Sequence, residues 1–187
     1  MSVQLFIAAL LLFDGSVADR QSHTIDTQRS TMRVHVYKTG ALSALGHEHE
    51  IAAPIASGRV DLGAQSVELQ VDARALKVED PKGPDKDRPE VQKTMLGPEV
   101  LDVERNPRIS FRSTSAESAG SNAWKVNGNL TLHGQTRPVT VEVTERDGHY
   151  IGHSLVKQTD FGMKPPGKPG VRAKDEVRID FDIVLAR

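Results

Sequence analysis

The 187-residue sequence contains no cysteine. Disulfide bonds, thiolate nucleophiles, c-type haem attachment and a lipid-anchoring cysteine are therefore excluded. Aromatic residues are also scarce, at 4%, and the net charge is −1 without clusters of lysine or arginine. Nucleic-acid binders usually carry a basic patch, so we expect no nucleic-acid partner. The length is that of one domain, whose fold must rest on its own core.

Long apolar runs are missing except at the start, where residues 3–13 read VQLFIAALLLF. This run is too short to span a bilayer as a helix and has the length of a signal-peptide core. Small residues at Ser16 and Ala18 suit a cleavage site. We predict a signal peptide over residues 1–18, a domain over 19–187, a periplasmic or secreted location and no stable membrane anchor. The run lacks a preceding lysine or arginine, so a buried N-terminal helix or strand is the alternative.

Alternation of apolar and polar residues dominates the rest of the chain. In residues 126–132 the apolar side chains and Gly128 fall on one side and the polar ones on the other, and residues 139–144 repeat the pattern. A period of two indicates a strand with one buried face. The two runs are joined by a short polar connection that contains Gly134 and Pro138, which predicts a β-hairpin.

Similar alternating runs at residues 32–37, 57–62, 67–73, 109–113, 150–156 and 177–185 give about eight strands. Residues 89–96 predict one short helix, because proline suits the first turn and Gly97-Pro98 ends it. We therefore predict an all-β fold, an extended antiparallel β-barrel with one short helical insertion. A β-sandwich is the competing architecture, because alternation is the same in both.

Groups that could carry catalysis are few. His133 lies beside the hairpin turn, where an imidazole more often binds backbone groups than acts as a base. No nucleophile elbow, phosphate-binding loop or paired carboxylates appear in the sequence. We predict that the protein is not an enzyme and has no cofactor; a hydrolase or isomerase is the alternative.

His47 and His49 are the candidate metal ligands. In an extended segment they point to the same side, about 6.5 Å apart along the strand, so they could share a zinc ion if a third ligand joined them. A divalent-metal-responsive binding module is therefore an alternative function. Two solvated histidines at a loop or strand edge explain the pair equally well.

The apolar faces of the predicted strands have two interpretations. They could fill a barrel core, in a structural domain without ligand, or they could line a cavity, because an eight-stranded barrel is just wide enough for one small ligand. Mid-sized aliphatic residues with few aromatics favour a cavity. The predicted ligand-binding residues are Val60, Leu69, Val71, Phe111, Leu130, Leu132, Val141, Ile179 and Phe181.

Residues 127–139, NGNLTLHGQTRPV, resemble the signature G-x-L-T-x-H-G-x-T-[KR]-P-V of the YceI-like, polyisoprenoid-binding family. Residues 23–26, 58–61, 106–114, 159–163 and 175–179 resemble further elements of this family in the same order. One departure lies after the helix, where the family usually has an aromatic pair and this chain has Val100-Leu101.

The resemblance implies a lipocalin-like barrel whose elongated pore holds an isoprenoid or a similar long-chain lipid, without catalysis. The expected partner is thus a long-chain lipid, and a homodimer is left open. The departure at Val100-Leu101 bears on ligand length and on the shape of the mouth.

Overall fold

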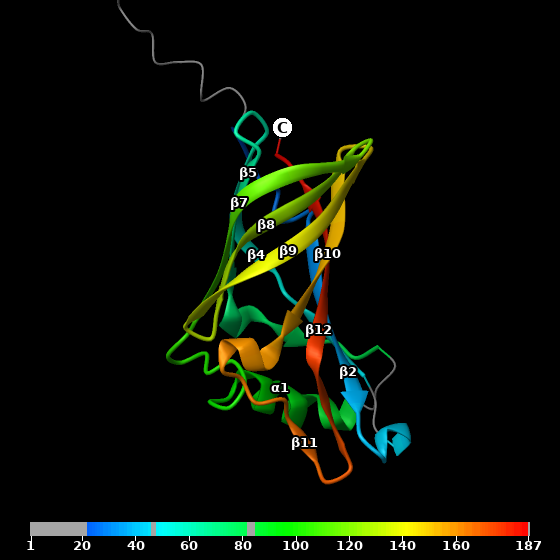
Figure 1. The fold of residues 1–187 in the computed structure, drawn as a ribbon. Coiled ribbons are helices and arrows are strands. Elements are labelled where there is room, and N and C mark those ends of the chain that lie inside the picture. Colours follow the sequence, from blue (N-terminus) through cyan, green and yellow to red (C-terminus); the bar gives the residue numbers. More distant parts are fainter. Residues whose placement is uncertain (1–21, 46–47, 82–84, 187) are drawn as a thin grey trace, which may run out of the picture.

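The computed structural model describes residues 22–45, 48–81 and 85–186 (Figure 1). The predicted signal peptide (residues 1–18) and His47 lie outside these residues. The described chain forms an elongated barrel of antiparallel strands, with helix α1 across one end (Figure 1).

One sheet contains all the described strands. They are β1 (Ser22–Thr24), β2 (Thr31–Thr39), β3 (His49–Ala52), β4 (Ile55–Asp61), β5 (Ser66–Asp72), β6 (Lys77–Val78), β7 (Arg108–Gly120), β8 (Ala123–Leu132), β9 (Gln135–Arg146), β10 (His149–Lys157), β11 (Gly167–Lys168) and β12 (Val171–Val184). The helices are α1 (Arg88–Leu96) and the short 3-10 turns η2 (Ser43–Leu45), η3 (Ala73–Ala75), η4 (Asp85–Asp87) and η5 (Gln158–Phe161).

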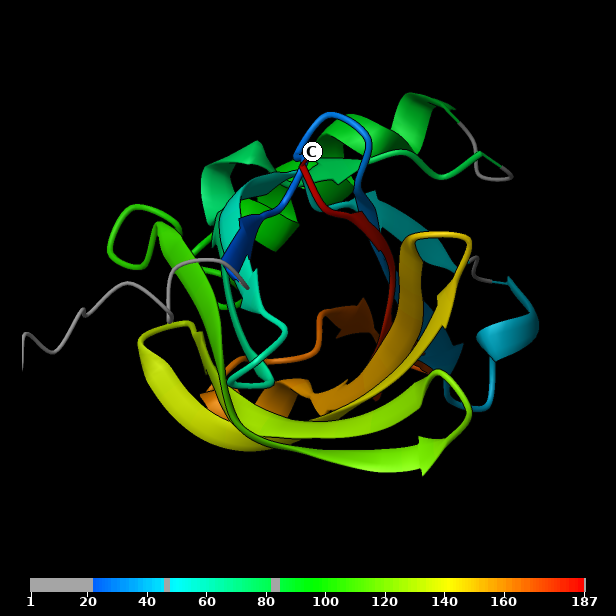
Figure 2. The same ribbon diagram turned by 90° about the horizontal axis from the view of Figure 1, so that it is seen from above.

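The strands follow the order β1-β4-β5-β7-β8-β9-β10-β12-β2-β3-β6, with β11 paired to β12. Seen along the long axis, this sheet curls into a ring (Figure 2). Curling lets every strand present one face to a shared interior and leaves few unpaired edges.

The ring closes at residues 22–26, where the described part of the chain starts. Strand β1 pairs with β4, and the residues after it reach the end of β12 through an Ile25–Leu185 bridge. The backbone N–H of Asp26 donates to the Val184 carbonyl at 2.8 Å, and Ala186 donates to Thr24 at 2.8 Å. This segment therefore joins the two sides of the barrel at the end remote from α1, which we call the strand end.

The hairpin predicted from alternation is β8–β9. Its connection is shorter than the sequence suggested, because strand pairing runs to Leu132 and Gln135 and leaves only His133 and Gly134 in the turn. Both have positive φ, 50° and 70°, which is the backbone of the two-residue turns that match the twist of paired strands. Pro138 sits inside β9, at a point where no residue of β10 pairs with it.

The opposite end of the molecule, which we call the helical end, is built from α1, residues 97–103, η5 and residues 162–166 (Figure 1). After Gly97 ends the helix, the chain turns back on it: Leu101 donates to the Met95 carbonyl at 3.1 Å and Val103 to the Leu96 carbonyl at 3.2 Å. These bonds satisfy carbonyls that a helix end otherwise leaves unpaired. Lys164 ties residues 162–166 to this turn through its N–H, 2.8 Å from the Glu99 carbonyl oxygen.

The predicted all-β barrel with one short helix is confirmed, and the helix is within a residue of its predicted start. The predicted count of about eight strands is wrong, because the described residues form twelve. The additional strands β1, β3, β6 and β11 have two to four residues each. Such segments are too short to show alternation, so only their pairing partners reveal them.

Candidate functional site

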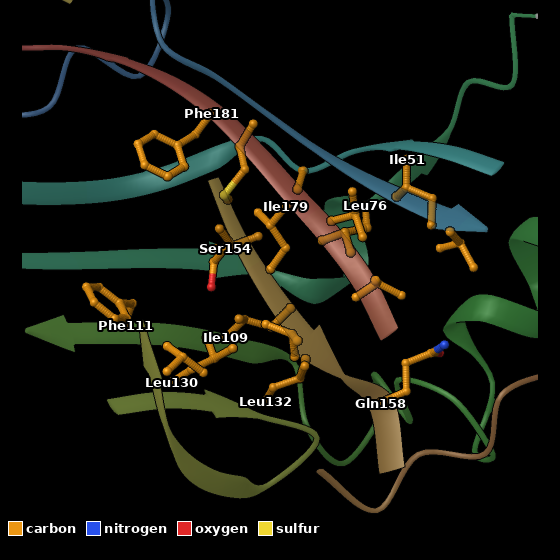
Figure 3. A pocket seen from close by; sticks show the side chains of 18 of the residues that line it. Ile51, Leu76, Ile109, Phe111, Leu130, Leu132, Ser154, Gln158, Ile179 and Phe181 are labelled. Atoms are coloured by element: carbon orange, nitrogen blue, oxygen red, sulfur yellow. The ribbon is translucent and has the colours of Figure 1, made fainter. Parts of the chain in front are cut away.

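The barrel encloses a cavity of about 1080 Å³. Its wall is formed by inward-facing side chains of the long strands, and its lining extends to α1 and to Val100 and Leu101 at the helical end. Figure 3 shows side chains from several strands converging on this space. A cavity of this size exceeds the usual range of sites for drug-sized ligands, so it suits a long molecule.

All nine residues that alternation marked as ligand-binding line the cavity: Val60, Leu69, Val71, Phe111, Leu130, Leu132, Val141, Ile179 and Phe181. They come from six strands, so the barrel brings together residues that the sequence separates by more than a hundred positions. Their role in ligand binding stays a prediction.

The two phenylalanines of this set leave space at the centre because each lies against a glycine of a neighbouring strand. A Cβ atom added to Gly128 would collide with the Phe111 ring, and one added to Gly152 would lie 2.6 Å from Phe181 Cζ. Missing side chains on β8 and β10 thus let both rings lie close to the wall. In strands, glycine often marks such a close approach.

Val100 and Leu101 are both buried and line the cavity. They pack in one apolar cluster with Met95 of α1 and Met163. These side chains therefore bound the cavity at the helical end.

Two buried polar side chains interrupt the apolar lining, Ser154 and Gln158. Ser154 Oγ donates to the Thr140 carbonyl at 2.8 Å, next to the last residue pair between β9 and β10. Gln158 Nε2 donates to the Lys174 carbonyl at 2.9 Å. Neither residue was predicted from the sequence, although Gly152, Ser154, Val156 and Gln158 follow a period of two along β10 and one residue past its end.

At the strand end, Tyr150 and Trp124 line the cavity with ring centroids 6.5 Å apart. Burial of the phenol, with a smaller contribution from the negative charge of Glu145, raises the pKa of Tyr150 above its usual value. Burial acts in this direction because it disfavours the phenolate.

His49, one of the two predicted metal ligands, is held by a buried carboxylate. Its Nδ1 lies 2.7 Å from Asp80 Oδ2, and because an ionised carboxylate only accepts, the ring donates. The other oxygen of Asp80 accepts from the Glu50 N–H at 2.8 Å. Residues 22–45, 48–81 and 85–186 contain no group of three or more histidine, aspartate or glutamate side chains placed to hold a metal ion. Since His47 lies outside them, the metal site stays a prediction.

His133 has the backbone role that its position suggested. Its Nδ1 hydrogen bonds to the Phe161 carbonyl at 2.9 Å. The bond joins the β8–β9 turn to η5, so this imidazole holds the hairpin against the helical end.

No helix in the part of the chain described here is both long and apolar enough to cross a membrane.

The model of one protein family, described as the YceI-like domain, matches residues 23–185. A UPF0312 protein of Vibrio cholerae serotype O1 is 24% identical over 180 residues, which cover 89% of each chain. A UPF0312 protein of Pseudomonas putida strain W619 is 36% identical over 89 residues, 42% of this chain and 46% of the relative. The match thus spans about half the length of the Pseudomonas protein.

Solved structures share the fold. The crystal structure of Burkholderia cenocepacia BcnA aligns with a TM-score of 0.64 at 21% identity, covering 87% of this chain and 99% of that one. A YceI protein of Campylobacter jejuni aligns with a TM-score of 0.52 at 12% identity, covering 73% and 81%. At these identities the likeness concerns the fold alone.

Proposed function

Because the chain belongs to the YceI-like family, we propose that it binds a long-chain lipid, an isoprenoid or a similar amphiphile, inside its barrel. The observation that carries the proposal is the apolar cavity of about 1080 Å³ that the inward faces of the strands enclose. A packed core would have left no such space, since protein interiors are normally filled to the density of organic crystals.

The energetics support a long chain rather than a small ligand. Burying ten methylene groups contributes about 8 kcal/mol in total, at about 0.8 kcal/mol each. Association itself costs about 4–15 kcal/mol in lost freedom of motion. Micromolar binding, about −8 kcal/mol, therefore needs either more methylenes or a preformed cavity that holds little ordered water.

The proposed role is binding rather than catalysis, because the YceI-like family is known as a polyisoprenoid-binding family. The proposal includes export, for which the apolar run at residues 3–13 and the small residues before Asp19 are the support. Expression in a bacterial host followed by intact-mass measurement of the exported protein tests this part: we expect a chain that begins near Asp19. A mass that still includes residues 1–18 would contradict it.

Native mass spectrometry of the purified protein, followed by organic extraction, tests the central proposal. We expect a stoichiometric long-chain adduct that is lost on denaturation. A protein that carries no adduct and takes up no added isoprenoid would overturn the proposal and favour a metal-binding or purely structural role.

A pair of substitutions places the ligand inside the barrel. Phe181→Asp puts a charge in the cavity, whereas Ile151→Asp puts the same charge on the outer face, where Ile151 is 44% exposed. We expect the inner substitution to abolish ligand retention and the outer one to leave it unchanged. Equal retention by two folded variants would exclude an interior site.

A further inference from the structure

Gln158 is the buried amide of the cavity. It begins η5 directly after β10, is only 5% exposed and lines the cavity near the end where α1 lies (Figure 3). Long polar side chains are seldom buried to this degree without a partner for each polar atom. The side-chain amide has two N–H donors and one oxygen acceptor, and each of the three groups needs a hydrogen-bond partner.

One N–H of Gln158 has a structural role. It donates to the Lys174 carbonyl at 2.9 Å, in the stretch of β12 between Ala173 and Val177 where pairing with β2 is irregular. The next residue, Thr159, donates its N–H and its hydroxyl to the Asp175 carboxylate at 2.9 and 2.7 Å. These three bonds fix η5 to β12, so the position of the Gln158 amide is set before any ligand arrives.

The oxygen of the same amide has no hydrogen-bond partner in the described chain. Because the Lys174 carbonyl can only accept, the atom bonded to it is nitrogen and the other is Oε1. No hydrogen bond to Oε1 occurs within the described chain. Oε1 is not among the solvent-inaccessible side-chain atoms of the described chain that lack a hydrogen bond, so it is not cut off from the cavity.

Ser154, the other buried polar residue of the lining, likewise offers a hydrogen-bond acceptor. Its hydroxyl hydrogen is used by the Thr140 carbonyl, which leaves only the lone pairs of Oγ for a ligand. Both residues thus offer acceptor oxygens to the interior. None of the charged residues along the described lining is fully buried: Lys86, Lys168 and Arg172 are exposed, and Lys38 is half-buried. A carboxylate or phosphate at the depth of Gln158 would find no buried cation.

We propose that Gln158 anchors the head of the ligand, and that this head is a neutral group that donates a hydrogen bond, such as a hydroxyl or a primary amide. The inference rests on the proposed lipid-binding function and specifies the ligand class. A donor from the ligand pairs with Oε1, and a carbonyl on the same head, where present, accepts the second N–H. An anionic head is disfavoured, because it would bring a negative charge against an acceptor oxygen in an apolar cavity.

The test compares four octadecyl compounds of equal chain length: the alcohol, the primary amide, the methyl ether and the carboxylate. Competition is followed by native mass spectrometry with wild type, Gln158→Met and Ser154→Ala. We expect wild type to prefer the alcohol and the amide to the ether about tenfold, the usual size of one buried hydrogen bond, and to bind the carboxylate no better than the ether. Comparing ratios within each protein removes differences in chain solubility.

Gln158→Met should lose this preference while retaining the ether, whereas Ser154→Ala should keep it. Wild type that binds ether and alcohol equally, or a preference that disappears only in Ser154→Ala, would overturn the assignment of Gln158 and leave the lipid-binding function standing. Failure of all four compounds to bind would instead contradict the function itself. If Gln158→Met does not fold, the ratios of the wild type still decide.

Discussion

The helical end and the wall of the barrel use apolar residues in different ways. At the helical end, Met95, Val100, Leu101, Phe161 and Met163 are all buried and pack against one another. Along the wall toward the strand end, residues such as Leu69, Phe111, Ile179 and Phe181 face inward yet are only partly buried. The unburied surface of the wall borders the cavity.

This difference indicates that the stability of the fold and the size of the ligand that fits depend on different regions. Deleting atoms from a filled region loses contacts and leaves a new void, whereas deleting them from a wall that already borders empty space loses less. The helical end is therefore expected to hold the fold together, and the wall to determine what fits inside. The following substitutions test that division, beginning with the largest effect.

Removing the same side chain at the two places should have unequal effects. Phe161 is 1% exposed, so Phe161→Ala is expected to destabilise the fold by about 3–5 kcal/mol. Phe181→Ala should cost less than about 2 kcal/mol, because part of the ring already faces the cavity. Urea denaturation of the ligand-free proteins measures both. Equal losses of stability would mean that the wall is as tightly packed as the helical end.

Adding a side chain at a glycine of the wall should strain the fold and reduce the space for a ligand. In Gly128→Ala the new Cβ collides with the Phe111 ring and lies 2.7 Å from the Arg112 carbonyl oxygen. We expect a loss of about 1–3 kcal/mol from overpacking, together with weaker uptake of long chains as the ring moves inward. The double variant Gly128→Ala, Phe111→Leu should recover uptake if the ring is the cause. A single variant with unchanged uptake and stability would show that the ring has other room.

The attachment of α1 can be weakened without touching the wall. Gln92 accepts from the Val78 N–H at 2.7 Å and donates to the Leu76 carbonyl at 2.8 Å, so its amide pairs with the backbone as a further strand would. Gln92→Ala should cost about 1–3 kcal/mol and speed hydrogen exchange in β6. Gln70→Ala, at an exposed position of β5, is the matched control. Ligand uptake should stay unchanged in both.

The smallest effect concerns Tyr150 at the strand end, whose pKa burial raises. Because the folded pKa exceeds the unfolded one, the stabilisation from the neutral phenol is present below the unfolded pKa and is lost as pH rises toward the folded pKa. An absorbance titration of a Tyr37→Phe variant isolates this phenol. We expect ionisation at higher pH than in the denatured chain, and at still higher pH when a lipid fills the cavity. Ionisation at the same pH folded and unfolded would contradict burial of the ring.

Much of this organisation can be predicted from local sequence. Alternation over residues 126–144 identified the hairpin and its inward side, and the proline and glycine around residues 89–97 identified the helix. The connection was predicted to run on to Pro138, whereas the turn contains only His133 and Gly134. Proline is typical of a loop, and the sequence does not reveal that no residue of β10 pairs with Pro138. Gln158 was missed for a similar reason: a polar residue before a Pro/Gly-rich loop gives no local sign of burial.

The sequence by itself determined which residues share the inward faces of the strands, because side-chain direction follows from the two-residue period of an extended chain. Whether those faces meet in a packed core or around a space was decided only by the tertiary structure. The same alternation serves both outcomes. The difference comes from ring closure by residues 22–26, from the glycines that let Phe111 and Phe181 lie against the wall, and from the bonds that hold Gln158 at the helical end. Each depends on contacts between residues far apart in the chain.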